Sequence, residues 1–270
     1  KMPKYAIVSE QGRRPAMEDA HRVEINFANK GWLFLAVYDG HGGAYAAQFT
    51  GQNLERFFLE EILKGNHPKE AFRAAYERIS QELAHQESGT TAATCLIGDK
   101  ILYCANAGDA RILMVGENDA IQLSCDHRLN NEEEKKRVVE AGGIVDWPYA
   151  THPKTSEGLM VTRSLGDEWA KSFGIISDPY TSEYALQRSD LAVVIGCDGL
   201  FDELTNDEVA TIVRQAPDMK TASETLRHQA LDVRKGTDNL TIILLNVSEI
   251  FRKRESLMKR WTRIFRNVRK

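Results

Sequence analysis

Two apolar runs end abruptly at an aspartate-glycine pair, and this pattern limits the folds open to the chain. Residues 32–39 read WLFLAVYD and are followed by GHGG, while residues 191–199 read LAVVIGCDG. An apolar run without polar alternation is typical of a strand that is buried on both faces. Asp39 and Asp198 therefore end buried strands, where an ionised carboxylate is costly unless it is paired or binds a cation.

Further β-rich runs predict strands, and helical periodicity is confined to fewer places. Helices are predicted around 54–62, 68–83 and 131–141, and two late helices open with capping pairs at Thr205 and Thr221. Strands and helices do not alternate along the chain as they do in a parallel βαβ sheet. This order favours antiparallel sheets covered by helices. The expected strands are 5–9, 32–39, 91–98, 101–107, 111–116, 191–197 and 240–247, with Gly108-Asp109 as a hairpin turn between two of them.

The composition is that of an ordinary globular protein. A chain of 270 residues with 42% hydrophobic residues suits one large domain or two small ones. No stretch approaches the roughly 20 apolar residues of a membrane span. The four cysteines lie in or beside apolar runs without a CxxC pair. We expect them to be buried free thiols, which indicates a reducing compartment such as the cytoplasm.

More carboxylates accompany the two strand ends. Asp238 lies just before the last apolar run, and Glu18 and Asp19 fall in the polar segment EQGRRPAMEDAH. Acidic groups that converge without Cys or clustered His suit a hard divalent cation, Mg²⁺ or Mn²⁺. Gly40 allows a close backbone approach, so its carbonyl could be a ligand. A single Asp-Gly pair is more often a turn, but its repetition at the edges of apolar runs favours a metal site.

A histidine and an arginine beside these carboxylates add groups suited to phosphate ester hydrolysis. His41 lies between glycines, and its ordinary pKa of about 6.5 suits a general acid. Arg13 and Arg14 either form exposed ion pairs or hold two phosphoryl oxygens in a guanidinium fork. Two ions that share a carboxylate can activate a water for in-line attack on phosphorus, and the acid then protonates the leaving alkoxide.

Seven motifs, in this order, resemble those of the metal-dependent type 2C Ser/Thr protein phosphatases. They are EQGRRPAMEDAH, YDGHGG, SGTTA, NAGDARIL, TRSLGD, CDGLFD and GTDNLTIIL, and they extend from about Tyr5 to Val247. The resemblance implies an α+β fold, a four-layer α-β-β-α sandwich of two antiparallel sheets flanked by helix pairs. It assigns residues 1–249 to a catalytic domain that includes a flap at roughly 147–180. Glu157, Phe201 and the start of the flap depart from the family pattern.

The resemblance also implies a role for each position of the core metal site. Asp39 is expected to bridge two metals. Asp198 and Asp238 complete the coordination of one of them, and the carbonyl of Gly40 binds the other. Glu18 is expected to act through a metal-bound water.

Other roles follow from the same resemblance. Asp19 is an outer partner of the metal site, and Asp109 and Asp202 are the carboxylates for a weaker third metal. Arg14 binds the phosphate and His41 is the general acid. The expected activity is therefore hydrolysis of phosphoserine and phosphothreonine in phosphoprotein substrates by a metal-bridging water, dependent on Mg²⁺ or Mn²⁺.

Two other functions remain open from the sequence. One is a pseudophosphatase that binds phosphoproteins or scaffolds a kinase, although the intact acidic positions argue against it. The other is a metallohydrolase of small phosphate esters, which a deep closed pocket would favour. We expect a monomer and no specific nucleic acid partner.

The last residues of the chain have a charge opposite to that of the rest. Residues 251–270 contain nine Lys or Arg and one Glu, a net charge of +8, so the remainder carries −12 because the total is −4. Apolar residues recur there at helical spacing, which predicts a basic amphipathic helix at 250–270. It could pack on its own acidic domain, fray, inhibit the domain, or bind an anionic membrane, nucleic acid or a protein partner.

Overall fold

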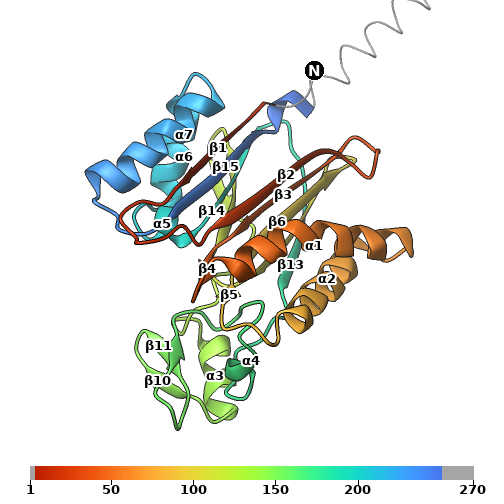
Figure 1. Cartoon of the computed structure of the whole chain (residues 1–270). Coiled ribbons are helices and arrows are strands. Elements are labelled where there is room, and N and C mark those ends of the chain that lie inside the picture. The colour runs from red at the N-terminus through yellow and green to blue at the C-terminus, as the bar shows by residue number, and fades with distance from the viewer. Residues whose placement is uncertain (1–3, 251–270) are drawn as a thin grey trace, which may run out of the picture.

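Two antiparallel five-stranded sheets that face each other form the body of the molecule (Figure 1). The computed structural model describes residues 4–250. The first sheet has the order β1-β15-β14-β8-β9 and consists of Tyr5–Glu10, Leu240–Asn246, Asp190–Gly196, Arg111–Gly116 and Ala120–Gln122. The second has the order β13-β7-β6-β3-β2 and consists of Tyr180–Ala185, Ile101–Ala107, Ala92–Gly98, Trp32–Tyr38 and Ala20–Phe27. A two-stranded ribbon, β4 (Gly40–His41) with β5 (Gly89–Thr90), continues from the end of β3.

Burial on both faces explains the unbroken apolar run of β3. Alternate side chains enter the core between the sheets, namely Leu33, Leu35 and Val37. The others enter the core beneath the helices, namely Phe34, Ala36 and Tyr38. In β14, Val193 and Ile195 likewise face the other sheet while Val194 faces helices. Helix, sheet, sheet and helix are thus stacked in four layers, which confirms the predicted fold class.

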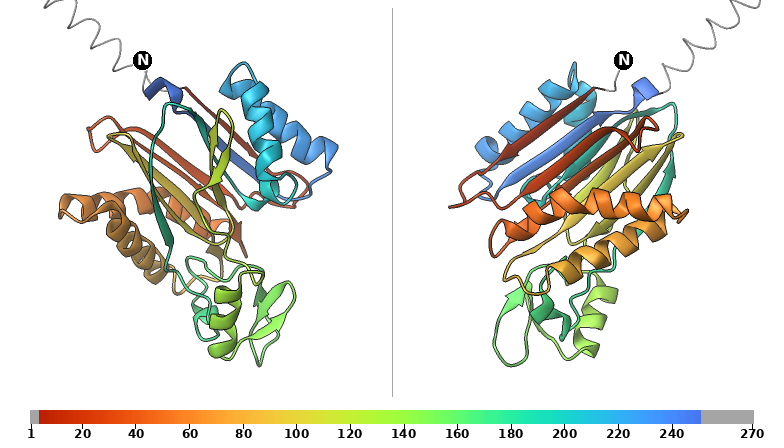
Figure 2. Two further views of the ribbon diagram at one scale, coloured as in Figure 1. Left: turned by 180° about the vertical axis from the view of Figure 1, so that it is seen from behind. Right: turned by 45° about the vertical axis from the view of Figure 1, so that its right-hand side comes forward.

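One pair of long helices covers each sheet, as Figures 1 and 2 show. Helices α1 (Tyr45–Leu63) and α2 (Pro68–Glu82) lie on the second sheet, where the rings of Phe58 and Phe72 stack with centroids 4.2 Å apart. The first sheet is covered by α6 (Asn206–Gln215), α7 (Met219–Arg227), the short α5 (Asp198–Phe201) and the π-helical η1 (His228–Val233). Among the described residues, no helix combines the length and apolar character needed to cross a bilayer. The basic helix predicted at 250–270 lies, apart from its first residue, outside the described residues.

The predicted start of one late helix is correct and that of the other is wrong. Helix α6 begins after Thr205, whose side chain forms a capping box with Glu208. Helix α7 begins at Met219 and not after Thr221, because the side chain of Asp218 caps it by accepting the N–H of Thr221 at 2.8 Å. Aspartate is as good an N-cap as threonine, and the Thr221 pattern lies one turn inside the helix.

The predicted hairpin at Gly108-Asp109 is also wrong, because the two strands that it joins belong to different sheets. Strand β7 pairs with β6 and β13, whereas β8 pairs with β14 and β9. Gly108 has a φ of 96°, in the region that favours glycine, and the chain there crosses from the second sheet to the first. The crossing leaves the Asp109 side chain buried at the end of both sheets.

The four cysteines are free. Cys95, Cys104 and Cys197 are buried as predicted, and Cys125 is only partly buried. Cys95 and Cys104 are cross-strand neighbours with sulfur atoms 3.7 Å apart.

Most of residues 123–179 form a small lobe at one end of the sandwich (Figure 1), although Leu123 still packs in the core between the sheets. It contains the three-stranded sheet β10 (Ile144–Asp146), β11 (Tyr149–Thr151) and β12 (Gly158–Leu159), with helices α3 (Glu132–Glu140) and α4 (Glu168–Lys171). Phe173 and Val138 are central to a separate small core. The lobe therefore packs as a unit beside the end of the sheets where Asp39 lies.

The buried carboxylate of Glu134 joins helix α3 to the segment that contains Thr162 and Arg163. Glu134 is 2% exposed and accepts hydrogen bonds from Arg137 at 2.6 Å, Arg163 at 2.7 Å and Thr162 at 2.6 Å. Burial alone would raise the pKa of Glu134, but these hydrogen bonds outweigh it and hold the pKa below its ordinary value.

We predict that Glu134→Gln lowers the free energy of unfolding by about 3 kcal/mol, because two partly buried arginines lose their counter-charge. Since the folded-state pKa is depressed, this stabilisation is complete above the ordinary pKa of about 4.3 and is lost as the pH falls through the folded-state value. Urea unfolding followed by circular dichroism at neutral and acidic pH measures both effects. Glu133→Gln, at an exposed position of the same helical turn, is the control, and an equal cost in both variants would contradict the prediction.

Candidate metal centre and active site

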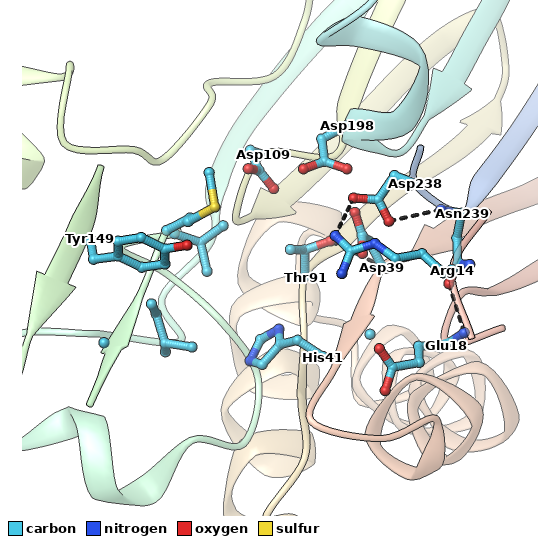
Figure 3. Close-up of a pocket in the computed structure, with 15 residues that line it drawn as sticks. Arg14, Glu18, Asp39, His41, Thr91, Asp109, Tyr149, Asp198, Asp238 and Asn239 are labelled. Atoms are coloured by element: carbon cyan, nitrogen blue, oxygen red, sulfur yellow. Dashed lines mark hydrogen bonds and ion pairs between the residues drawn. The ribbon is translucent and has the colours of Figure 1, made fainter. Parts of the chain in front are cut away.

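A cavity of about 240 Å³ opens where β3, β14 and β15 begin or end, between the sandwich and the small lobe (Figure 3). Acidic and basic groups from the sandwich line one side, and the backbone and apolar groups of the small lobe line the other. The lining residues are Arg14, Glu18, Asp39, Gly40, His41, Thr91, Asp109, Tyr149, Gly158, Leu159, Met160, Val161, Asp198, Asp238 and Asn239.

Three carboxylates from distant parts of the chain converge in this cavity. Asp39, Asp109 and Asp198 each place an oxygen within 4.8 Å of the others. Burial raises the pKa of Asp39 well above its ordinary value, and the charges of Asp198 and Asp19 raise it further. Burial and the charge of Asp109 likewise raise the pKa of Asp198. Such carboxylates favour either a proton or a bound cation, and a divalent cation suits a set made only of oxygen atoms.

The backbone of Asp39 is held from three sides, so its carboxylate is fixed at the end of β3. The N–H of Thr91 donates to the Asp39 carbonyl at 2.8 Å, and the Thr90 hydroxyl donates to the same oxygen at 3.1 Å. The Asp39 N–H donates to the hydroxyl of Thr91 at 3.3 Å. Ser88 supports the next segment, where its hydroxyl accepts the N–H of Ala46 at 3.1 Å.

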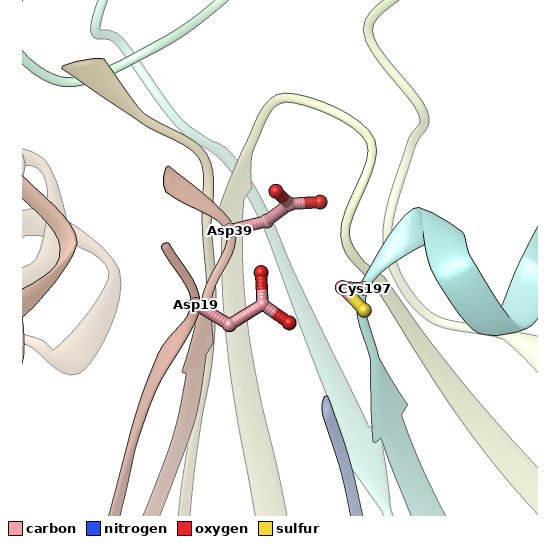
Figure 4. Close-up of side chains that lie close together, drawn as sticks. All are labelled: Asp19, Asp39 and Cys197. Carbon is pink, nitrogen blue, oxygen red and sulfur yellow. The ribbon is translucent and has the colours of Figure 1, made fainter. Parts of the chain in front are cut away.

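Asp19 has two buried carboxylate oxygens without a hydrogen-bond partner among the described residues. Figure 4 shows the Asp19 carboxylate beside the carboxylate of Asp39 and the thiol of Cys197. One oxygen of each carboxylate and the Cys197 sulfur lie within 4.8 Å of one another. Burial raises the pKa of Asp19 to about 6. Buried carboxylate oxygens usually have a hydrogen-bond partner. Where the protein offers none, beside other carboxylates, a bound cation or an ordered water is the expected partner.

Asn239 holds the loop that carries Arg14 and Glu18 against β15. Its amide donates to the carbonyls of Gln11 at 2.8 Å and Ala16 at 2.9 Å, and its oxygen accepts the Glu18 N–H at 2.8 Å. Asn239 thus positions the backbone of this loop. The Glu18 carboxylate in turn accepts the N–H of Gly43 at 2.6 Å.

Arg14 reaches over the cavity and pairs with Asp238, with 2.6 Å between Nη2 and Oδ2 (Figure 3). The hydrogen bond to Asp238 raises the pKa of the guanidinium, so it stays charged. Just over half of the Arg14 side chain is exposed, so part of its fork faces the cavity. Arg13 points elsewhere and donates to the carbonyl of Lys235 at 3.4 Å.

His41 forms a hydrogen-bonded pair with Asp167 of the small lobe, with 2.8 Å between Nε2 and Oδ2. The Asp167 side chain is 1% exposed and also accepts the hydroxyl of Ser164 at 2.6 Å. Burial works to lower the pKa of His41, but the bond to Asp167 outweighs it and the pKa is raised. Because Asp167 engages Nε2, Nδ1 is the ring nitrogen left for other partners.

Arg128 lies beside the carboxylate cluster and was not singled out by the sequence. Its guanidinium contacts Asp109, Asp198 and Asp202. Asp202 is about half exposed and does not line the cavity, so of the predicted acidic positions it lies farthest outward.

The structure therefore brings most of the predicted residues to one cavity, with Asp19 and Asp202 beside it, and adds others. Asp167 lies in the TRSLGD motif, but the motif gives no role to it. Tyr149 and Met160 line the cavity from the small lobe, and neither stands out in the sequence. Only its position opposite the carboxylates identifies Tyr149 (Figure 3), and Met160 is identified only as a lining residue of the same cavity.

Comparisons with known proteins agree with this geometry. The family model for protein phosphatase 2C matches residues 4–239. The chain is 32% identical over 248 residues to a probable protein phosphatase 2C 45 of Oryza sativa subsp. japonica, covering 89% of this chain and 86% of the relative. It is 29% identical over 256 residues to protein phosphatase 2C homolog 1 of Saccharomyces cerevisiae, covering 86% of this chain and 88% of that protein.

A similar fold occurs in a solved serine-threonine phosphatase 2C from Toxoplasma gondii. The TM-score is 0.80 with 18% sequence identity, over 91% of this chain and 96% of that chain. The shared architecture is the sandwich of two antiparallel sheets with helices on both sides.

We predict that Gly89→Ala breaks the pair between His41 and Asp167. A Cβ at Gly89 would come within 2.0 Å of Asp167 Oδ2 and 2.4 Å of His41 Nε2. The ¹⁵N NMR signal of Nε2, which reports its hydrogen bond, should shift. Gly51→Ala is the control, because a Cβ there meets Tyr38 at an ordinary 3.5 Å. An unchanged Nε2 signal in folded Gly89→Ala would contradict the prediction.

Proposed function

Because the chain belongs to the protein phosphatase 2C family and is a metal-dependent protein serine/threonine phosphatase, we propose that this cavity binds two divalent cations and a phosphoserine or phosphothreonine side chain. The observation that carries the proposal is the convergence of Asp39 and Asp198, with oxygens within 4.8 Å of each other, in a cavity that Asp238 also lines. We infer Mg²⁺ or Mn²⁺ as the ion, because the donors that face the cavity are carboxylate and carbonyl oxygens.

The core ligands proposed here follow the family resemblance, and all of them line the cavity. Asp39 is proposed to serve both ions. Asp198 and Asp238 would complete one position, and the Gly40 carbonyl would bind the other ion. Glu18 is held toward the cavity by the Gly43 N–H.

Asp19 is proposed to contact the ion site indirectly, through water. Its two orphaned oxygens fit an outer partner that accepts hydrogen bonds from ordered water. When bound, the two ions supply Lewis acidity and an activated water for direct attack on phosphorus.

Arg14 is proposed to bind two oxygens of the phosphoryl group. Its bond to Asp238 aims the guanidinium across the cavity and leaves other N–H groups free to donate. A guanidinium suits this role because its planar fork matches two phosphoryl oxygens.

His41 is proposed to donate the proton that the leaving alkoxide needs. Asp167 fixes the ring through Nε2, so the proton is delivered from Nδ1, and the negative charge of Asp167 favours the protonated ring. Asp167 is thus a positioning residue that acts through His41.

We assign residues 1–249 to the catalytic domain of a monomer that acts on phosphoprotein substrates in the cytoplasm. The basic segment at 250–270 is proposed as a contact for an anionic membrane or a protein partner, since its charge of +8 is opposite to that of the domain.

The test of the proposed site is hydrolysis of a phosphoserine peptide with Mn²⁺, with EDTA, and by Asp198→Ala. We predict that the variant loses turnover and binds Mn²⁺ more weakly in calorimetry while its circular dichroism is unchanged, because one ion loses a charged ligand. Asp207→Ala, at an exposed carboxylate of α6, should behave as wild type. Full activity of Asp198→Ala is incompatible with this site, and peptide binding without turnover by wild type would indicate a pseudophosphatase.

A second prediction separates the general acid from the ions. His41→Gln should lower kcat for a phosphoserine peptide by about 100-fold or more, the usual contribution of a general acid. The loss for p-nitrophenyl phosphate should be much smaller, because its leaving group needs little protonation. His85→Gln, at an exposed position, is the control. Equal losses on both substrates would reject the role of His41.

A further inference from the structure

The carboxylates that the sequence assigns to a third metal are already engaged by a cation of the protein. Arg128 Nε donates to Asp109 Oδ2 at 2.5 Å. Nη1 and Nη2 donate to the two oxygens of Asp202 at 2.9 and 3.0 Å. Nη2 also approaches Asp198 Oδ2 at 3.2 Å.

These contacts use the oxygens that a third ion would need. A divalent cation holds carboxylate oxygens at about 2.0–2.6 Å from its centre and requires them to converge on one point. Here both oxygens of Asp202 lie against a planar guanidinium fork, and the 3% exposed Asp109 turns an oxygen to Nε of the same group. The arrangement matches a bidentate arginine-carboxylate pair and does not fit an ion between Asp109 and Asp202.

The backbone of Arg128 is bonded to the part of the small lobe that lines the cavity. It forms a β-bridge with Val161, and the carbonyl of the preceding residue, His127, accepts the N–H of Thr162 at 2.8 Å. Val161 lines the cavity from the small lobe. The side chain of Arg128 therefore reaches the acidic cluster while its backbone holds the opposite wall of the same cavity.

We propose that the Arg128 guanidinium stands in place of a third metal between Asp109 and Asp202, and fastens the small lobe to the catalytic carboxylates. This inference rests on the two-ion site of the proposed function. The chain then binds two divalent ions. The small lobe is held to the carboxylates by the charged Arg128 side chain, which is present at any metal concentration.

The test counts Mn²⁺ bound per chain, by equilibrium dialysis with metal analysis at millimolar Mn²⁺. Wild type should bind two ions. Arg128→Ala should gain one, because Asp109 and Asp202 lose their counter-charge, and Arg128→Ala combined with Asp202→Asn should lose it again. Arg111→Ala is the control, since Arg111 pairs with Asp126 and lies outside the cluster.

The single variant Asp202→Asn decides the matter without removing the arginine, even if Arg128→Ala fails to fold. It should leave the number of bound ions at two. A third ion in wild type that Asp202→Asn abolishes would overturn the inference, and so would a folded Arg128→Ala that gains no ion. Wild type that binds no Mn²⁺ would overturn the two-ion site and this inference together.

Discussion

The packing of two apolar sheets against each other determines where charge can lie in this protein. Strands such as β3 and β14 are buried on both faces, so their interiors accept almost only apolar side chains. Carboxylates on these strands are admitted only where the strand ends. Because the strands of both sheets end beside one another, residues far apart in the chain reach one cavity, and their mutual repulsion must be offset by cations.

Two arginines offset part of this repulsion in different ways. Arg14 makes one bond to Asp238 at the exposed side of the cavity, and its remaining donors are available to a substrate. Arg128 donates to three carboxylates, and its guanidinium is largely saturated by the protein. The first arrangement suits reversible binding of an anion, whereas the second suits a permanent structural contact.

Local patterns in the sequence predict antiparallel sheets covered by helices, whereas the four-layer arrangement follows from the family resemblance. The acidic strand ends can also be predicted locally. An apolar run that stops at aspartate can be recognised from a few neighbouring residues. Strand pairing is harder to predict from local patterns. The Gly108-Asp109 pair is a typical turn signal and predicts a hairpin, but β7 and β8 belong to different sheets. Because β8 is almost entirely apolar and buried, no side-chain alternation shows which sheet it joins. The contacts of Asp167 and Arg128 depend on how the small lobe lies against the sandwich, and no local pattern encodes that placement.

The pairing of β1 with β15 has a consequence for the assembly of the protein during synthesis. Tyr5 lies opposite Leu245, so the edge strand β1, near one end of the described chain, can pair only after β15, near the other end, has been synthesised. The loop after β1 is held by Asn239, which directly precedes β15. Arg14 and Glu18 on that loop therefore reach their places in the cavity only after the ribosome has released nearly the whole domain, so the cavity is completed late in synthesis.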